Sequence, residues 1–193
     1  MRIIAGSRKG HRIEAPQGTS TRPKGDRVRE STFSLVGPVD DAHVLDLYAG
    51  SGALGIEALS RGAARATFVD SDRAACRAID RNLEKLRLTG ATVLCAPVET
   101  VLAREVTAGR KYDLVLLDPP YDMTDHEPLA RYVPRLLAED GLVVFETAAR
   151  VEPELPLAKR TSRKYGSVRV TLFEQPVSVS SGAAGGGRAE GTV

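Results

Sequence analysis

The chain has 193 residues, of which 42% are apolar and 27% charged, and its formal net charge is +2. These values are typical of a single globular domain that buries a sizeable core. No apolar run approaches the about 18 residues that cross a bilayer, and the N-terminus has no apolar signal-peptide core, which argues against membrane insertion and secretion. We therefore expect a cytoplasmic protein without a membrane partner.

Cysteines and histidines are few and scattered. Cys76 lies in a helical pattern and Cys95 in a strand pattern, without a Cys-x-x-Cys pair or neighbouring histidines. We expect two buried, reduced thiols and no metal site.

The small net charge conceals two basic stretches. Residues 1–35 carry eight basic and three acidic side chains, and five basic side chains follow Leu155 with no acidic residue before Phe173. Together they could form one face that suits a phosphate backbone, and the alternative is two solvated charge runs.

The first 37 residues have their own pattern. Residues 2–13 predict a β-hairpin with a glycine-rich basic turn, and a loop follows from Pro16 to Gly25. Asp26 is expected to N-cap a helix that runs to about Val36 and ends at Gly37-Pro38.

From His43 onward, apolar strands alternate with amphipathic helices. The expected strands are 43–48, 65–70, 91–95, 112–117 and 141–146, and the expected helices are 53–61, 72–87, 99–105 and 127–138. This alternation predicts an α/β fold with a mostly parallel sheet, helices on both faces and right-handed crossovers.

Two further strands, 159–165 and 168–174, are joined only by Gly166-Ser167. A parallel crossover needs a longer connection, so we expect these two strands to be antiparallel. Residues 177–193 are rich in Gly, Ser and Ala and predict a mobile tail.

A glycine-rich turn follows the first strand of the alternation. Gly50, Gly52 and Gly55 have the G-x-G-x-x-G spacing, which lets backbone N–H groups approach a ligand. Asp70 ends the next strand, where a carboxylate can accept hydrogen bonds from ribose hydroxyls. Asp46 precedes the turn, where it would repel a pyrophosphate but could face an ammonium group directly or through water.

The tetrad Asp118-Pro119-Pro120-Tyr121 follows the apolar strand 112–117. The Asp side chain and a backbone carbonyl can accept the two hydrogens of an exocyclic amine, and the aromatic ring can stack on the base that carries it. The prolines stiffen the turn and remove N–H donors. Together with Asp46 and Asp70, the tetrad favours S-adenosylmethionine over NAD as the cofactor.

Residues 43–147 resemble a class I S-adenosylmethionine-dependent methyltransferase of the amino type. The chain to about Glu174 resembles the bacterial 16S ribosomal RNA guanine-N2 methyltransferases. The resemblance is carried by four segments in order: Arg2-Ile3-Ile4-Ala5-Gly6 with Gly10, Thr21-Arg22-Pro23 with Asp26–Glu30, Asp46–Gly55, and Asp118–Tyr121.

The resemblance implies a Rossmann-like methyltransferase fold with a seven-stranded sheet at residues 38–176 and an N-terminal extension at 1–37 that covers RNA or cofactor. The tail at 177–193 has no counterpart in the resemblance. It also implies methylation of the N2 amine of one guanine in 16S rRNA, in an assembling small subunit. The sequence leaves the oligomeric state open, and we take a monomer as the default expectation. Two segments depart from the family pattern. Lys24-Gly25 replace the small hydroxyl residues of a cofactor contact, and Ala96-Pro97-Val98 lack the polar residue that often holds the adenine amine. We therefore expect adenine to be held by apolar packing and backbone groups, with Val98 as the candidate.

The candidate site residues fall into three groups. We expect catalysis from Asp118, Pro119, Pro120 and Tyr121. The cofactor-binding residues are expected to be Asp46, Tyr48, Ala49, Gly50, Ser51, Gly52, Gly55, Asp70, Ser71 and Val98. The RNA-binding residues are expected to be Arg8, Lys9, Arg22, Arg27, Arg29, Arg163 and Lys164, although Arg27 and Arg29 are equally compatible with ordinary helix-surface charges.

Asp118 and the Pro119 carbonyl are expected to accept the two N–H bonds of the target amine, which aims its lone pair at the methyl carbon. The target guanine must lie in a loop or be flipped out of a duplex. The rival functions are a DNA adenine-N6 methyltransferase, a protein-glutamine methyltransferase, an NAD-dependent oxidoreductase and a non-catalytic RNA-binding module.

Overall fold

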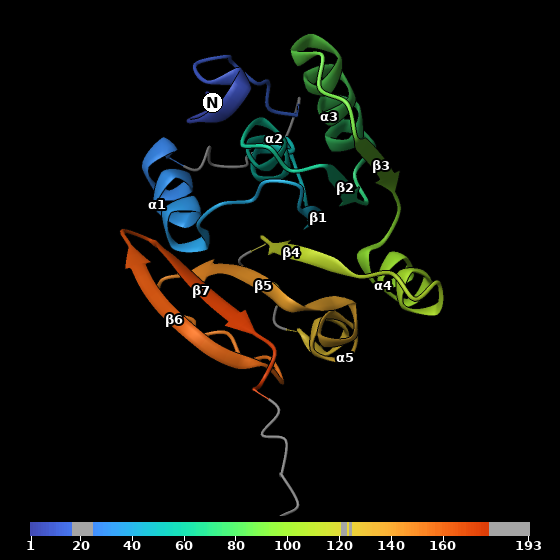
Figure 1. Ribbon diagram of the computed structural model, residues 1–193, viewed down its shortest axis with the longest axis vertical. Coiled ribbons are helices and arrows are strands. Elements are labelled where there is room, and N and C mark those ends of the chain that lie inside the picture. Colours follow the sequence, from blue (N-terminus) through green and yellow to red (C-terminus); the bar gives the residue numbers. More distant parts are fainter. Residues whose placement is uncertain (17–24, 121–122, 124, 178–193) are drawn as a thin grey trace, which may run out of the picture.

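The computed structural model describes residues 1–16, 25–120, 123 and 125–177. Seven strands form one sheet in the order β3-β2-β1-β4-β5-β7-β6 (Figure 1). The strands are β1 (His43–Leu47), β2 (Arg65–Asp70), β3 (Ala91–Cys95), β4 (Tyr112–Leu117), β5 (Leu137–Ala148), β6 (Ala158–Tyr165) and β7 (Val168–Glu174). The pairs among β1 to β5 are parallel, and β7 pairs antiparallel with both β5 and β6.

The helices form a layer on each face of this sheet. They are the 3₁₀ turn η1 (Gly6–Arg8) and the helices α1 (Asp26–Val36), α2 (Ala53–Ser60), α3 (Arg73–Leu86), α4 (Val98–Thr107) and α5 (Glu127–Leu136). One core cluster joins α1, α2, α3 and the N-terminal segment to Val44 and Leu114, and a second joins α4 and α5 to Leu45 and Val115. Because both faces are buried, each central strand is an apolar run.

The expected α/β architecture and the antiparallel final pair are confirmed. The expected bounds of the strands at 65–70, 91–95, 112–117 and 168–174 are also correct. The strand expected at 141–146 is longer, because β5 begins at Leu137, directly after α5.

The predicted N-terminal hairpin is present in a short form. Arg2 and Arg12 form an antiparallel bridge, flanked by backbone hydrogen bonds from Ile3 N–H to the His11 carbonyl at 2.9 Å and from Ile13 N–H to the Met1 carbonyl at 3.1 Å, and η1 lies in the turn. Beyond this bridge, the carboxylate oxygens of Glu57 on α2 accept the backbone N–H groups of Ile4 at 2.8 Å and Ala5 at 3.0 Å. These donors are therefore satisfied by a side chain, not by an opposing strand.

Helix α1 has the expected length, but Asp26 is not its N-cap. Gly25 is the N-cap, and Asp26 is the first helical residue, where its carboxylate accepts a hydrogen bond from Arg29 at 3.1 Å. Gly37 ends the helix with φ at +88°, a conformation that favours glycine.

Candidate functional site

The candidate site lies at the carboxyl ends of three neighbouring strands. β1 sits between β2 and β4, so the segments that leave these strands meet at one edge of the sheet. The backbone N–H of Asp118 lies 3.5 Å from the carbonyl oxygen of Leu47, which ties the turn after β4 to the end of β1. The topology thus brings the glycine-rich turn, Asp70 and the Asp-Pro-Pro segment together, as the sequence predicts.

The glycine-rich turn has left-handed backbone conformations at three residues: Tyr48 with φ at +59°, Gly50 at +57° and Gly52 at +76°. A Cβ at Gly50 would have only the Tyr48 carbonyl oxygen near it, at 4.0 Å, so the turn is open on that side. A Cβ at Gly55 would lie 2.4 Å from Cε1 of Phe68, so this glycine allows α2 to pack closely on β2. Gly50 therefore faces a possible ligand, whereas Gly55 serves helix packing.

Two carboxylates fix this turn in place. Asp46 is 1% exposed, and its Oδ2 accepts the backbone N–H of Gly55 at 2.9 Å. Asp70 is half-buried, and its two oxygens accept the N–H groups of Gly50 at 2.8 Å and Asp72 at 2.9 Å. Since a carboxylate oxygen has two acceptor positions, each oxygen of Asp70 still has room for a hydroxyl donor.

The remaining residues expected to bind the cofactor lie in the turn or follow β2. Tyr48 and Ala49 are half-buried, Ser51 is buried, and Ser71 is exposed. Burial, reinforced by the charge of Glu99, raises the pKa of Tyr48 to about 12, so the phenol is neutral at physiological pH. The Ser51 carbonyl accepts a hydrogen bond from the buried Asn82 of α3 at 3.0 Å.

For Val98, the structure favours a backbone contact over the expected apolar packing. Its side chain is 4% exposed and packs in the core cluster under α4 and α5, so it is not placed to cover an adenine ring. Val98 is the first residue of α4, and its backbone N–H has no partner within the helix. The backbone of Val98 is therefore better suited than its side chain to contact a ligand.

These groups fit S-adenosylmethionine better than a dinucleotide. Asp46 and Asp70 place two carboxylates at the turn where a pyrophosphate would have to bind. The half-buried Asp70 can accept ribose hydroxyls, and the negative charge favours a cationic ligand. The absence of a Cβ at Gly50 leaves space beside the turn.

Asp118 is half-buried at the end of β4, Pro119 is buried and Pro120 is exposed. The Pro120 carbonyl accepts the N–H of Met123 at 3.0 Å, so this acceptor is occupied by the turn itself. Tyr121, the expected stacking residue, lies outside the described residues.

The predicted RNA-binding residues do not form one group. Lys9, Arg27, Arg163 and Lys164 are exposed, whereas Arg22 lies outside the described residues. Arg8 is half-buried and donates from Nε to the Leu86 carbonyl at 2.6 Å, at the end of α3. Arg163 and Lys164 precede the β6–β7 turn, at the carboxyl end of β5, because Val168 pairs with Ala148.

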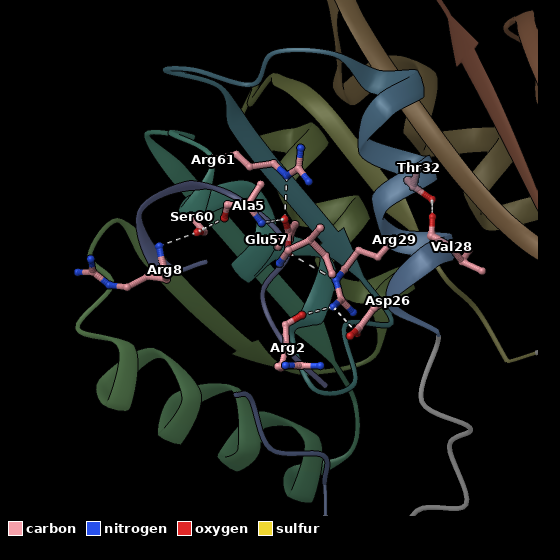
Figure 2. Close-up of polar contacts among 12 residues, drawn as sticks. Arg2, Ala5, Arg8, Asp26, Val28, Arg29, Thr32, Glu57, Ser60 and Arg61 are labelled. Carbon is pink, nitrogen blue, oxygen red and sulfur yellow. Dashed lines mark hydrogen bonds and ion pairs between the residues drawn. The ribbon is translucent and has the colours of Figure 1, made fainter. Parts of the chain in front are cut away.

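Arg29 was expected to contact RNA or to be a surface charge of α1, and both expectations are wrong. Its side chain is 1% exposed and cannot reach RNA (Figure 2). Its guanidinium forms an ion pair with Glu57 at 3.6 Å and donates to the Asp26 carboxylate and the Arg2 carbonyl. Glu57 is 0% exposed and also accepts from Nε of Arg61 at 2.8 Å. Arg29 therefore joins α1 to α2 and the N-terminal segment.

Sequence reasoning missed several structural polar residues, most of all Glu57. The sequence signal for Glu57 was an ionisable residue inside the apolar helix Ala-Leu-Gly-Ile-Glu-Ala-Leu-Ser.

The expectation that both cysteines are buried is wrong for Cys95, which is exposed, and correct for Cys76. Burial and the adjacent Cys95 raise the pKa of the Cys76 thiol to about 12, so it is inert as a nucleophile.

A hollow of about 360 Å³ lies at the opposite edge of the sheet, before β1 and β4, and includes Asp40, Asp41, Asp113 and Asp140 in its lining. It shares no residue with the candidate site.

Across the described ranges, no group of three or more His, Cys, Asp or Glu side chains could hold a metal ion. Nor does any helix there have the length and apolarity to cross a membrane.

Comparison with known proteins places the chain in a family. A family model described as "Conserved hypothetical protein 95" matches residues 1–174. "Putative rRNA methyltransferase YlbH" of Bacillus subtilis is 40% identical over 182 residues, which cover 91% of this chain and 99% of that protein. "Ribosomal RNA small subunit methyltransferase D" of Escherichia coli is 38% identical over 156 residues, which cover 80% of this chain and 75% of that protein.

Solved structures agree with this fold. The structure described as "Putative methyltransferase yhhF from Escherichia coli" has a TM-score of 0.80 and 34% identity, with 91% of this chain and 97% of that chain covered. A structure described as "Crystal structure of SMU.776, a putative methyltransferase complexed with SAH" has a TM-score of 0.65 at 17% identity, over 76% of this chain and 48% of that chain. The second likeness concerns the fold alone.

Proposed function

The chain belongs to the conserved hypothetical protein 95 family, and we propose that it uses S-adenosylmethionine to methylate small-subunit ribosomal RNA. The observation that carries this proposal is the order β2-β1-β4, which puts Asp70 and the glycine-rich turn beside Asp118 at one edge of the sheet. The names of the Escherichia coli and Bacillus subtilis relatives support rRNA as the substrate.

Within that activity, we propose the exocyclic N2 amine of a guanine as the methyl acceptor. The cofactor would supply an electrophilic methyl group on a sulfonium centre. Asp70 and the glycine-rich turn would hold the cofactor, and the buried Asp46 would support this site by fixing the turn through Gly55. Asp118 and the Pro119 carbonyl would accept the two N–H bonds of the amine, so that its lone pair points at the methyl carbon. The turn after Asp118 is stiffened by two prolines, which limits the reorganisation needed during the reaction.

The remaining assignments follow from this role. We propose that residues 38–176 perform the reaction, that residues 1–37 extend the substrate-binding surface, and that the enzyme acts in the cytoplasm as a monomer. The substrate is proposed to be 16S rRNA in an assembling small subunit, where a loop guanine can still be reached. The Asp-Pro-Pro turn would also suit an adenine amine, so adenine-N6 methylation of DNA is the second candidate.

The test is methyl transfer from labelled S-adenosylmethionine to small subunits, free 16S rRNA and duplex DNA, with the modified nucleoside identified by mass spectrometry. The RNA should come from cells that lack the gene, so that the target is unmodified. We expect N2-methylguanosine from the RNA substrates and no product from DNA. N6-methyladenine in the DNA, or no product from any RNA, would contradict the proposal.

The role of Asp118 is tested by Asp118→Ala, which should nearly abolish turnover while calorimetry still detects cofactor binding. Asp113→Ala is the matched control, because Asp113 lies at the other end of β4 and accepts the His43 N–H at 2.8 Å. The control should keep near-normal turnover. Unchanged turnover in Asp118→Ala would refute the assignment.

A further inference from the structure

One exposed face of α3 carries a row of basic residues that the sequence analysis did not assign. They recur at every fourth position, which places them on one ridge of the helix. This set, called the α3 ridge, consists of Arg73, Arg77, Arg81 and Lys85, and all four are exposed. At 1.5 Å per residue, the ridge is about 18 Å long.

This arrangement is unfavourable for the helix itself. Like charges four residues apart repel each other, and Arg73 lies in the first turn, where the helix dipole disfavours a cation. Glu14 compensates the far end of the ridge, since its carboxylate lies 3.1 Å from Lys85 and 4.0 Å from Arg81. Among the described residues, no ion pair joins Arg73 or Arg77 to an acid, not even to the nearby Asp80.

The ridge begins next to the candidate site. Helix α3 begins three residues after Asp70. Asp72 connects Asp70 to the helix, because its backbone N–H donates to the Asp70 carboxylate and its own carboxylate accepts the backbone N–H of Ala74. Arg73 and Arg77 therefore lie at the end of the helix nearest the cofactor-binding carboxylate. The other end leads away from the site along the face of the molecule.

The N-terminal segment extends the same basic surface. Arg8 binds the carbonyls of Leu86 and Arg87, which places the exposed Lys9 beside the end of α3. Residues 1–16 and 72–87 together carry nine basic and four acidic side chains, whereas the whole chain has a net charge of only +2. These segments therefore form a basic surface, and Figure 1 shows the N-terminal segment near α2 and α3 at the top of the view.

We propose that the α3 ridge is a docking surface for the phosphate backbone of the RNA that carries the target base. This inference rests on the proposed function, and it adds which face of the protein the RNA crosses. A row of guanidinium groups suits consecutive phosphates, and such contacts fix the register of a nucleic acid without reading its sequence. Binding of phosphates to the ridge would also relieve the repulsion between its like charges.

The test compares two double variants of the full chain. Arg73→Gln/Arg77→Gln removes two charges from the ridge next to the site. Arg131→Gln/Arg135→Gln is the matched control, because both arginines are exposed and four residues apart on α5, on the opposite face of the sheet. The measurements are RNA binding by fluorescence anisotropy from about 50 to 200 mM salt, and kcat and KM for RNA.

We expect the ridge variant to bind RNA more weakly and with a weaker salt dependence. Each phosphate contact contributes about 0.7–0.9 to the slope of log affinity against log salt, so losing two contacts should make the slope about 1.5 shallower. Its KM for RNA should rise about tenfold, with kcat at saturating RNA and cofactor affinity unchanged, as for contacts that only position the substrate. The control should match the wild type. A ridge variant that equals the control in affinity and salt slope would overturn the inference and leave the α3 ridge a solvated face.

These outcomes are separable from those of the proposed function. If the wild-type enzyme methylates RNA but the two double variants behave alike, only the docking surface is wrong. If the wild-type enzyme methylates no RNA, the proposed function is wrong, and the binding measurement still decides whether the ridge contacts a polyanion.

Discussion

Removing the charge of Glu57 should strongly destabilise the fold, although Glu57 lies outside the candidate site. Its carboxylate accepts the N–H groups of Ile4 and Ala5 at 2.8 and 3.0 Å and faces two guanidinium groups, those of Arg29 and Arg61 (Figure 2). In Glu57→Gln, one acceptor oxygen is replaced by an amide group that points at donors. Arg29, which is 1% exposed, then keeps Asp26 as its only ion-pair partner among the described residues.

The magnitude follows from what remains buried. Removing one partner of a buried ion pair costs about 3–5 kcal/mol, because the other charge stays desolvated. Arg61 is 21% exposed and adds little, since water can replace its partner. Against a total stability of about 5–15 kcal/mol, the loss is large enough to leave a marginal fold.

Urea unfolding monitored by circular dichroism measures this loss. For an m-value of about 2 kcal/mol/M, a loss of about 4 kcal/mol lowers the midpoint by about 2 M. Hydrogen exchange provides a local readout, because the amides of Ile4 and Ala5 should exchange faster in the variant. Glu84→Gln, at an exposed site on α3, is the control and should change stability by at most about 0.5 kcal/mol.

A double-mutant cycle separates the ion pair from the backbone contacts. Arg29→Met with Glu57→Met removes both charges, so the double variant should be less destabilised than the sum of the single variants, by about 0.5–3 kcal/mol. It should not recover fully, since Ile4 and Ala5 still lack an acceptor. A loss below about 1 kcal/mol in Glu57→Gln would refute the view that this network anchors the N-terminal segment.

Three further substitutions test other parts of the structure. Gly55→Ala should lower stability by about 1–3 kcal/mol in thermal unfolding despite the better helix propensity of alanine, because its Cβ would overlap Phe68. Asp70→Ala should weaken cofactor binding at least about tenfold in calorimetry, because the Gly50 N–H and the ribose hydroxyls of the cofactor would lose a charged hydrogen-bond acceptor. Burial and the bond to Glu105 raise the pKa of Tyr112 to about 12, so its contribution to stability is complete below pH 10 and is lost as the pH rises through 12. Tyr112→Phe should therefore lose less stability than the wild type between pH 10 and 12 in urea unfolding; equal losses would contradict this.

The sheet could be predicted because its signals are local. A parallel strand buried on both faces is an apolar run, and a glycine or polar turn at each end marks its limits. β5 was the exception, since Leu137 to Asp140 resembles a helix end, although its first residue pairs with Tyr112 across a register shift. The strand order itself came from the structure, which places the two chemical motifs at one edge of the sheet.

The N-terminal region could be predicted only in part, because a distant residue fixes it to the rest of the protein. The pattern of residues 2–13 predicts the hairpin, but no local signal shows that Glu57, more than 50 residues away, accepts the N–H groups of Ile4 and Ala5. The spacing of Arg27 and Arg29 on α1 gave no means to tell which faces solvent. Only the position of α2 shows that Arg29 is buried and Arg27 exposed.

This difference changes how the two basic stretches should be interpreted. Arg29 and Arg8 stabilise the protein internally, by binding Glu57 and the carbonyls at the end of α3, and so contribute less charge to the surface than the sequence implies. The contacts of Arg8 hold the N-terminal segment against α3, next to the end of the α3 ridge. A basic surface thus arises from segments more than 60 residues apart, because two arginines and one buried glutamate fix the segment that carries Lys9 beside α3, the helix that begins three residues after Asp70.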